Sequence, residues 1–330
     1  MKATAVKAPF IERIKVYLRD PLKKKIALNS IKDLVLTVLK YAILIGVGYV
    51  IVSPVIGMFV NSISSDADAY NPMMFILPKY PTTERYRLAI LRLDYWETLT
   101  KTLLYSVTVT MLQLLVCSMV GYGFARFNFP LKKFWFGCVI FTIVIPTHMI
   151  MLPLYVHFKD FNLFGIVAAL QKGKTGLMGT VVPMYILSLF GCGLRSGLFI
   201  YIFNQFFRGL PKEIEEAAFV DGANMFYTYF RIMLVNAMPA VITVTVFSFV
   251  WQFNDLFYAK LFLMPDTTVI SKRIGSLQAV IANEDNILSI TLQALYRDAG
   301  AILVIAPVVI VYLLLQKNFI EGVERSGIVG

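Results

Sequence analysis

The chain has 330 residues, of which 58% are hydrophobic and only 15% are charged. Soluble domains usually contain about 45–50% apolar and about 25% charged residues. One core cannot bury this apolar excess, so part of the surface must face lipid. The net charge of +11 raises the question of nucleic-acid binding, but the basic residues gather near the ends of apolar segments. That arrangement is typical of membrane topology instead.

The N-terminal segment, residues 1–33, is rich in Lys and Arg and poor in Asp and Glu. A secretory signal places a short apolar run and a small-residue cleavage site directly after its basic start. Here the first long apolar run can span a membrane and has no such site, so we expect a retained first helix. Residues Ile11–Leu18 form either a short basic amphipathic helix on the inner membrane surface or part of a solvated tail, and both readings stay open.

Six apolar segments reach the roughly 20 residues that a membrane-spanning helix needs. The sequence therefore predicts an all-α integral membrane protein, with six transmembrane helices in one domain over residues 34–318 and a C-terminal tail over residues 319–330. We expect Pro146, Pro153 and Pro307 to kink their spans. The expected spans are Leu34–Val60, Leu99–Phe124, Phe134–Phe158, Thr180–Phe207, Ala237–Leu263 and Ala299–Asn318.

The orientation follows from the short basic loops, which face the cytoplasm. The outer segments, residues 61–98, 159–179 and 264–298, are longer and mix both signs of charge. The sequence thus predicts a multi-pass plasma-membrane protein of a bacterium or archaeon with both termini in the cytoplasm. The basic residues of the cytoplasmic loops and tail are Arg126, Lys132, Lys133, Arg208, Lys212, Arg231, Lys317 and Arg325.

The connection between the fourth and fifth spans carries the signals of a short capped helix from Pro211 to Asp221. Proline suits a first helical position, because its missing N–H is not needed there. Acidic residues at 213, 215 and 216 complement the positive end of the helix dipole. Gly222 can adopt the left-handed conformation that ends a helix, and Asn224 can cap the next one.

One face of this short helix is predicted to contact another protein. Ile214, Ala217, Ala218 and Asp221 are spaced to share one side, and two alanines allow another protein to approach closely. The alternative is a helix resting on lipid headgroups. The acidic first turn argues against it, because the inner leaflet attracts basic segments.

The same segment resembles the EAA loop of binding-protein-dependent ABC importer permeases. The matching residues are Glu216-Ala217-Ala218, then Gly222, then Ile232 and Leu234. The family pattern continues with a proline, where this chain has Val235 and places Pro239 four residues later. We therefore expect a weaker kink at that point.

Three further segments are similar to the carbohydrate-uptake, maltose-type branch of that family. Ala125–Pro130 resembles its second cytoplasmic loop, and Trp251–Asp255 resembles its Trp-Asn-Asp segment. The C-terminal stretch Gln316–Gly330 is similar to its Gly-rich ending. Residues 1–33 and 61–98 are covered least.

The resemblance implies a type I ABC importer permease fold and a non-catalytic subunit of an ATP-driven importer for a mono- or oligosaccharide. It implies a second homologous permease subunit, an ABC ATPase dimer that holds ATP and Mg, and an extracellular solute-binding protein, with no cofactor on this chain. The EAA loop, at about 208–235, would transmit closure of the ATPases to the spans. The implied coupling residues are Pro211, Glu213, Glu216, Ala217, Ala218, Asp221, Gly222, Ile232 and Leu234.

Candidate substrate contacts are four polar or aromatic residues in the fourth and fifth spans: Arg195, Trp251, Asn254 and Asp255. Arg195 falls near the middle of a span, where a lipid-facing charge costs at least about 2.5–3.5 kcal/mol. It should therefore face the bundle interior or a wet cavity. It could contact substrate or gate the path, or it could pair with Asp255 or a partner subunit. Trp251, Asn254 and Asp255 could line a sugar path or anchor the outer interface.

Other signals predict no separate chemistry. Gly173-Lys174-Thr175 ends like a phosphate-binding loop, but Ala168 stands where that loop needs glycine. Gly191, Gly193 and Gly197 are better explained by tight helix packing than by dinucleotide binding. The dispersed cysteines and histidines (Cys117, Cys138, Cys192, His148 and His157) favour neither a disulfide nor a metal site.

Two other functional classes need features that this sequence would have to carry. An ion-coupled secondary transporter needs coupling acids or broken helices near the midplane, often in related halves. A membrane enzyme needs converging acid–base or metal groups. The sequence shows neither set clearly, so the importer permease is the preferred interpretation and the secondary transporter is its main alternative.

Overall fold

The computed structural model describes residues 21–70, 77–162, 165, 176–263 and 269–327. Every regular element within those ranges is helical, as the six long apolar segments predict. The chain divides into two compact units, residues Met1–Val60 and Asn61–Gly330. Each is described separately below.

The first unit contains most of α2, a continuous helix from Pro21 to Ser62 with Pro54 inside it. Its part from Asn29 to Ser62 is long and apolar enough to cross a membrane. The expected first span, Leu34–Val60, lies within it. The possible amphipathic segment Ile11–Leu18 lies outside the described residues.

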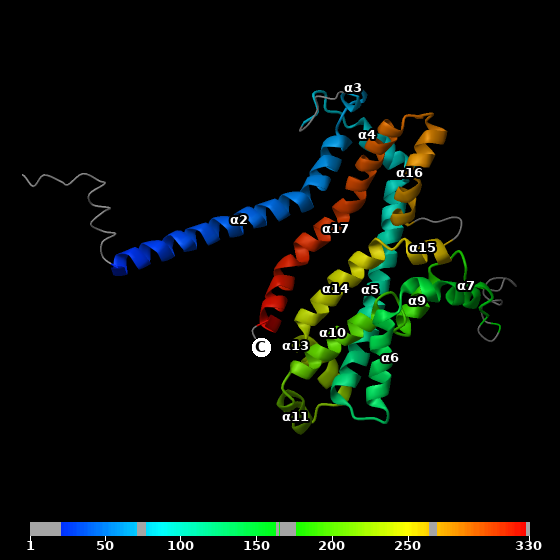
Figure 1. Cartoon of the computed structure of the whole chain (residues 1–330). Helices are drawn as coiled ribbons and strands as arrows, with labels where there is room; N and C mark the ends of the chain where they lie inside the picture. Colours follow the sequence, from blue (N-terminus) through cyan, green and yellow to red (C-terminus); the bar gives the residue numbers. More distant parts are fainter. Residues whose placement is uncertain (1–20, 71–76, 163–164, 166–175, 264–268, 328–330) are drawn as a thin grey trace, which may run out of the picture. The chain divides into compact units, whose positions relative to one another are not determined.

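The second unit is arranged around α5, which runs from Tyr95 to Arg126. Helix α10 (Ser196–Gly209) and helix α14 (Met238–Phe253) pack along it, and α17 (Ile290–Gly327) packs on α14 (Figure 1). Gly121 permits a close approach of α10 to α5, because a Cβ there would lie 2.6 Å from Cβ of Phe203 and 3.0 Å from the backbone nitrogen of Asn204. The expected sixth span, Ala299–Asn318, is part of α17, which continues to Gly327 through most of the range expected as a tail.

The third expected span is not one straight helix. Helix α6 (Lys132–Val144) ends before Pro146, and η1 (Thr147–Ile150) with α7 (Met151–Lys159) continues at 102° to it. The residue before a proline avoids helical geometry, and Ile145 has an extended ψ of 123°. The kink expected at Pro146 is confirmed, but the expectation of a continuous crossing from Phe134 to Phe158 is wrong.

The fourth and fifth expected spans are also interrupted. Helix α9 (Val182–Leu189) and helix α10 are separated by residues 190–195. The fifth expected span begins with a segment that is bent by 78° from α14. This segment consists of α12 (Met225–Tyr227), η3 (Thr228–Met233) and α13 (Leu234–Asn236). Helix α14 stops at Phe253, and α15 (Phe257–Phe262) follows separately. Within the described residues, three uninterrupted helices and two bent pairs are long and apolar enough to cross a membrane. The broken segment of α9 and α10 corresponds to the remaining expected span.

The second unit has two distinct ends along α5 (Figure 1). The α11 end is where α5 finishes and where the short helix α11 (Glu213–Val220) lies. The α16 end is where α5 begins, with α3 (Asp66–Ala69), α4 (Glu84–Arg92) and α16 (Ile270–Glu284).

Candidate functional site

The loop 208–235 folds as the short capped helix that its sequence predicts, with a later start. Helix α11 begins at Glu213, after its N-cap Lys212, so Pro211 is outside the helix and not at its first position. The backbone explains the shift, because the carbonyl of Lys212 already accepts bonds from the N–H groups of Glu215 and Glu216, at 3.0 and 3.1 Å.

The end of α11 and the start of the next helix are confirmed. Gly222 has φ of +83°, the left-handed region that glycine adopts without strain. Ala223 N–H donates to the carbonyl of Ala218, and Gly222 N–H donates to the carbonyl of Phe219. These two hydrogen bonds form a Schellman motif at the end of the helix. The side chain of Asn224 then accepts from Tyr227 N–H at 2.8 Å, which is an N-cap.

The expected single face of α11 is wrong, because its members divide between two sides. Ala218 is buried and Ile214 half-buried, whereas Ala217 and Asp221 are exposed with Glu213 and Glu216. The third inward residue is Glu215, which the sequence analysis did not select. An i, i+3, i+4 spacing identifies residues that can share a face, but only packing against α5 and η3 decides which side turns inward.

Glu215 and Arg126 form a buried ion pair, with Oε2 and Nε 2.6 Å apart. Tyr122 donates its hydroxyl hydrogen to Oε1 of Glu215 at 2.5 Å. The signal available in the sequence was three acidic residues in one turn. Because these three acidic residues point in different directions around the helix, at least one can face the protein. Their spacing in the sequence does not show which one contacts Arg126.

The outward side of the loop carries a large apolar surface, here called the α11 patch. Isolated exposed apolar residues are ordinary, but a contiguous group of large ones marks an interaction site. With the small Ala217 beside it, this surface has the shape and chemistry of a protein contact. The α11 patch consists of Phe219, Val220, Met225, Phe226 and Tyr227, and the exposed fraction reaches 86% at Val220.

The remaining loop residues, Ile232 and Leu234, are half-buried. Ile232 lies in η3, a π-helical turn, and such turns frequently occur at functional sites. The weak kink expected after them is wrong. The chain bends by 78° where α14 begins, and Pro239 occupies one of the first two positions of α14. Proline is favoured there because it needs no N–H partner.

A buried polar network holds the break in the fourth span. The Nε2 atom of Gln113, in the middle of α5, donates to the carbonyl of Leu194 at 2.8 Å and to the Ser196 hydroxyl at 3.1 Å. Its Oε1 accepts from Ser248 at 2.6 Å. A helix break inside a membrane leaves backbone groups that only protein can satisfy. Gln113 performs this role, and a lone amide in an apolar span was the sequence signal for it.

The glycines of this region pack closely, as expected. A Cβ on Gly193 would lie 2.7 Å from Oγ of Ser188, and one on Gly197 would lie 3.0 Å from the carbonyl oxygen of Val139. Gly191 has more room and a φ of +69°. Gly193 and Gly197 therefore allow α9, α10 and α6 to meet.

Arg195 lies at the break itself, as the residue before α10, with φ of +62°. Its side chain is exposed, and its guanidinium lies 5.4 Å from the ring centroid of Trp251. Among the described residues no carboxylate pairs with it. The suggested Arg195–Asp255 ion pair is therefore not formed in this conformation.

The other three candidate contacts separate by burial. Trp251 is half-buried and stacks on Phe199 and Phe247, whereas Asn254 is exposed at the end of α14. Asp255 is buried. One of its oxygens accepts from the N–H groups of Phe257 and Tyr258, while Oδ2 has no hydrogen-bond partner. The structure thus brings Arg195 to Trp251 but does not join the four residues into one site.

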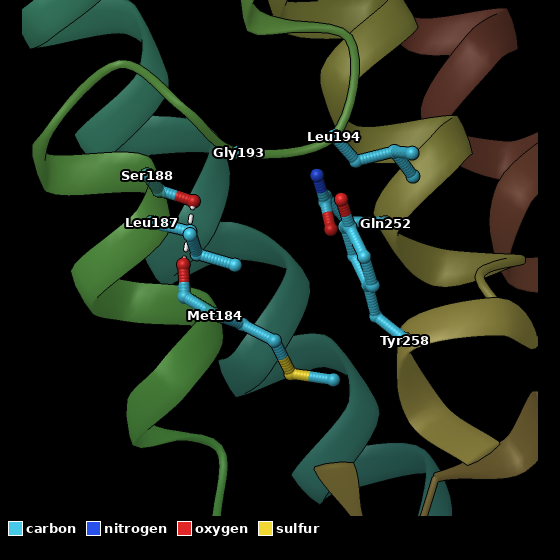
Figure 2. A pocket seen from close by; sticks show the side chains of 7 residues that line it. All are labelled: Met184, Leu187, Ser188, Gly193, Leu194, Gln252 and Tyr258. Carbon is cyan, nitrogen blue, oxygen red and sulfur yellow. Dashed lines mark hydrogen bonds between the residues drawn. The ribbon is translucent and has the colours of Figure 1, made fainter. Parts of the chain in front are cut away.

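A narrow crevice lies beside this region. Figure 2 shows the side chains of Gln252 and Tyr258 facing Ser188 and Met184 across it. Ser188 donates to the carbonyl of Met184 at 2.7 Å. The crevice is too narrow for a water molecule, so it is a packed joint between α9 and α14 and not a place for a sugar in this conformation.

Exposed and half-exposed ion pairs hold the α16 end. Arg92 of α4 reaches Asp285 at 2.6 Å and also contacts Glu284, and Arg273 lies 2.8 Å from Asp94. The hydrogen bond to Asp285, helped by the charges of both acids and opposed by desolvation, raises the pKa of Arg92. These contacts fasten the start of α5 to α16.

The other sequence signals add no site. No group of metal-binding side chains occurs in the described ranges, and all three cysteines are free. The range 173–175, which resembles part of a phosphate loop, lies outside the described residues.

Comparison with known proteins places these features in a family. A family model described as "Binding-protein-dependent transport system inner membrane component" matches residues 113–325. A probable ABC transporter permease protein of Pyrococcus horikoshii is 27% identical over 227 residues, covering 68% of this chain and 73% of that protein. An arabinooligosaccharide transport system permease protein of Halalkalibacterium halodurans is 26% identical over 237 residues, covering 72% and 75%.

A solved structure supports the fold. It is a bacterial ABC transporter involved in the import of the acidic polysaccharide alginate, and one chain matches with a TM-score of 0.71 at 21% identity. The match covers 87% of this chain and 98% of that one. The family match covers residues 113–325, which include the second half of α5, the broken fourth span and the loop 208–235. The chain therefore belongs to the binding-protein-dependent transport system inner membrane components, the permease subunits of ABC importers.

Proposed function

We propose that this chain imports a mono- or oligosaccharide, which an extracellular solute-binding protein delivers to it. The sugar class rests on the names of its relatives, one of which transports arabinooligosaccharides. In this proposal the permease is not an enzyme. ATP and Mg are held by a dimer of partner ATPases, and a second homologous permease completes the membrane assembly.

The observation that carries the coupling role is the outward side of the loop 208–235. Ala217 and the α11 patch are exposed on α11 and on the short helix α12 that follows it, and an apolar surface of this kind fits a groove on another protein. The ATPases would dock there, so the α11 end would face the cytoplasm and the α16 end the outside. Both termini would be cytoplasmic, with residues 1–33 as a basic cytoplasmic segment.

The proposed sugar path follows the break in the fourth span. Arg195, Trp251 and Asn254 are exposed or half-exposed beside it, and aromatic and amide groups suit polyols. Asp255 would join them only after a rearrangement, since its side chain is buried here. Anchoring at the membrane interface is the competing role for Trp251 and Asn254.

The docking role is tested with Ala217→Glu, which inserts a bulky charge into the proposed contact. The matched control is Ala279→Glu, an exposed alanine of α16 at the other end of the unit. The complex is purified and reconstituted with its binding protein in proteoliposomes. We expect Ala217→Glu to lose ATPase subunits or stimulated hydrolysis, while Ala279→Glu retains the ATPases. Equal ATPase retention and equal stimulated turnover in the two variants would contradict docking at α11.

The same proteoliposomes test the path. Arg195→Leu should reduce sugar uptake while the ATPases stay bound, because Arg195 precedes α10 whereas the docking loop follows that helix, and because Arg195 pairs with no described carboxylate. A variant that fails to assemble would instead show that Arg195 has a structural role.

A further inference from the structure

Glu215 occupies an unusual place for a carboxylate. Of the three acidic residues in the first turn of α11, Glu213 and Glu216 are exposed, whereas the Glu215 side chain is only 10% exposed. A buried charge is tolerated only when it is paired and hydrogen-bonded. Its neighbours must therefore compensate it.

Both oxygens of Glu215 are bound by the last turns of α5. Arg126, whose side chain is 7% exposed, lies 2.6 Å from Oε2, and the Tyr122 hydroxyl donates to Oε1 at 2.5 Å. The Nη2 atom of Arg126 also donates to the carbonyl of Leu210 at 2.8 Å. One arginine thus holds both the helix α11 and the chain that leads into it.

The link is anchored in packed aromatic residues. The Tyr122 ring lies 5.4 Å from Phe207 of α10 and 5.1 Å from Tyr229 of η3, centroid to centroid. Tyr229 is hydrogen-bonded in turn to Ser118 of α5, at 2.6 Å. Isolated helices as short as α11 are not stable in water, so its position depends on tertiary contacts. The Arg126–Glu215–Tyr122 contacts supply the polar part of them.

We propose that Arg126, Glu215 and Tyr122 form the link that makes α5 move with the docking helix. They are positioning residues and not part of the docking surface, because all three side chains are buried whereas the α11 patch is exposed. A displacement of α11 would reach α5 directly, and α5 carries Gln113, which holds the break of the fourth span. This inference rests on the proposed docking of the ATPases at α11.

The test distinguishes a loss of coupling between α11 and α5 from a loss of stability of the complex. Arg126→Met and Glu215→Met each leave one buried charge without its partner, whereas the double variant removes both charges. Replacing a buried ion pair by apolar residues of similar volume is often neutral for stability. The readouts are the thermal midpoint of the complex, ATPase retention, and sugar transported per ATP hydrolysed.

We expect the single variants to be unstable and the double variant to recover its thermal midpoint and its ATPases. Its transport per ATP should still fall about tenfold, a change within the usual range of coupling between sites. A double variant with the wild-type ratio would overturn the proposal. If the wild-type complex itself retains no ATPase, the proposed function fails instead, and the two failures are therefore distinct.

A second pair of variants keeps the proposal testable if the double variant does not fold. Tyr122→Phe removes only the hydroxyl that binds Glu215, and Tyr229→Phe removes a buried hydroxyl of the same cluster that binds Ser118 instead. Transport per ATP should fall about twofold or more in Tyr122→Phe alone, since a bond to a charged group is the stronger of the two. Equal ratios in the two variants would overturn the link.

Discussion

The two ends of the second unit are fastened by the same kind of interaction in opposite environments. At the α11 end, Glu215 and Arg126 are paired with side chains 10% and 7% exposed. At the α16 end, Arg92 has two acidic partners, and Glu284 is 54% exposed. The first contact is one buried ion pair, and the contact between α4 and α16 is a group of more exposed ones. A buried arginine also occurs at the α16 end, where Arg85 pairs with Asp66.

This difference decides what each end can do. An exposed pair is screened by water and salt, and losing one member leaves the others in place. A buried pair has no such substitute, so its geometry fixes one position of α11 relative to α5. The contact between α4 and α16 should therefore tolerate the loss of one member, whereas the contact between α5 and α11 should not.

The largest expected effect is all-or-none and concerns the side of the membrane. In a chain without native cysteines, Asn283→Cys at the α16 end should react with an impermeant thiol reagent added to intact cells. Asn128→Cys, which follows α5 at the α11 end, should react only after permeabilisation. Both asparagines are exposed. Labelling of position 128 from outside would reverse the proposed orientation of the two ends.

The next largest effect compares the two acids. Glu215→Ala leaves Arg126 buried without a charged partner, which costs about 3–5 kcal/mol. Glu284→Ala leaves Arg92 with Asp285, so its effect on stability should be much smaller and should shrink further at high salt. The measurement is the thermal midpoint of each purified variant at low and high salt. A Glu284→Ala loss as large as that of Glu215→Ala would remove the contrast between the ends.

The smallest effect compares two glycines in helix contacts. A Cβ at Gly121 would meet backbone atoms of α10, with Ile200 O and Asn204 N both at 3.0 Å. A Cβ at Gly300 would meet only the flexible tips of Leu277 and Ile274, at 2.6 and 2.9 Å. Gly121→Ala should therefore destabilise by about 1–3 kcal/mol, the usual cost of overpacking. Gly300→Ala should destabilise less, and the order of the two thermal midpoints checks this.

Much of the loop 208–235 could be predicted from its sequence. The short helix, the left-handed Gly222 and the Asn224 cap depend on residues within one or two turns of each other, so the relevant contacts are visible in the sequence. The start at Pro211 was wrong by two residues, because helix starts depend on backbone bonds that several neighbouring residues can make. The absence of the family's proline at position 235 led to the wrong expectation of a weak kink. The chain bends sharply just before α14, where Pro239 is one of the first two residues.

The side-chain partners could not be predicted in the same way. Glu215 meets Arg126, and Gln113 meets Leu194, only because α5 packs against segments far along the chain. Arg195 was expected inside a continuous span, and the break before α10 leaves it exposed beside Trp251. Its environment depends on a helix interruption that apolar length does not reveal.

The sequence by itself determined that this is a helical membrane protein with an EAA-type loop, because apolar length, charge placement and helix caps are local properties. Only the tertiary structure decided which acid of α11 is buried, where the spans break and which end relies on a single ion pair. The physical reason is that the effect of a charge or a small residue depends on its burial. Burial is set by the packing of helices that lie far apart in the chain.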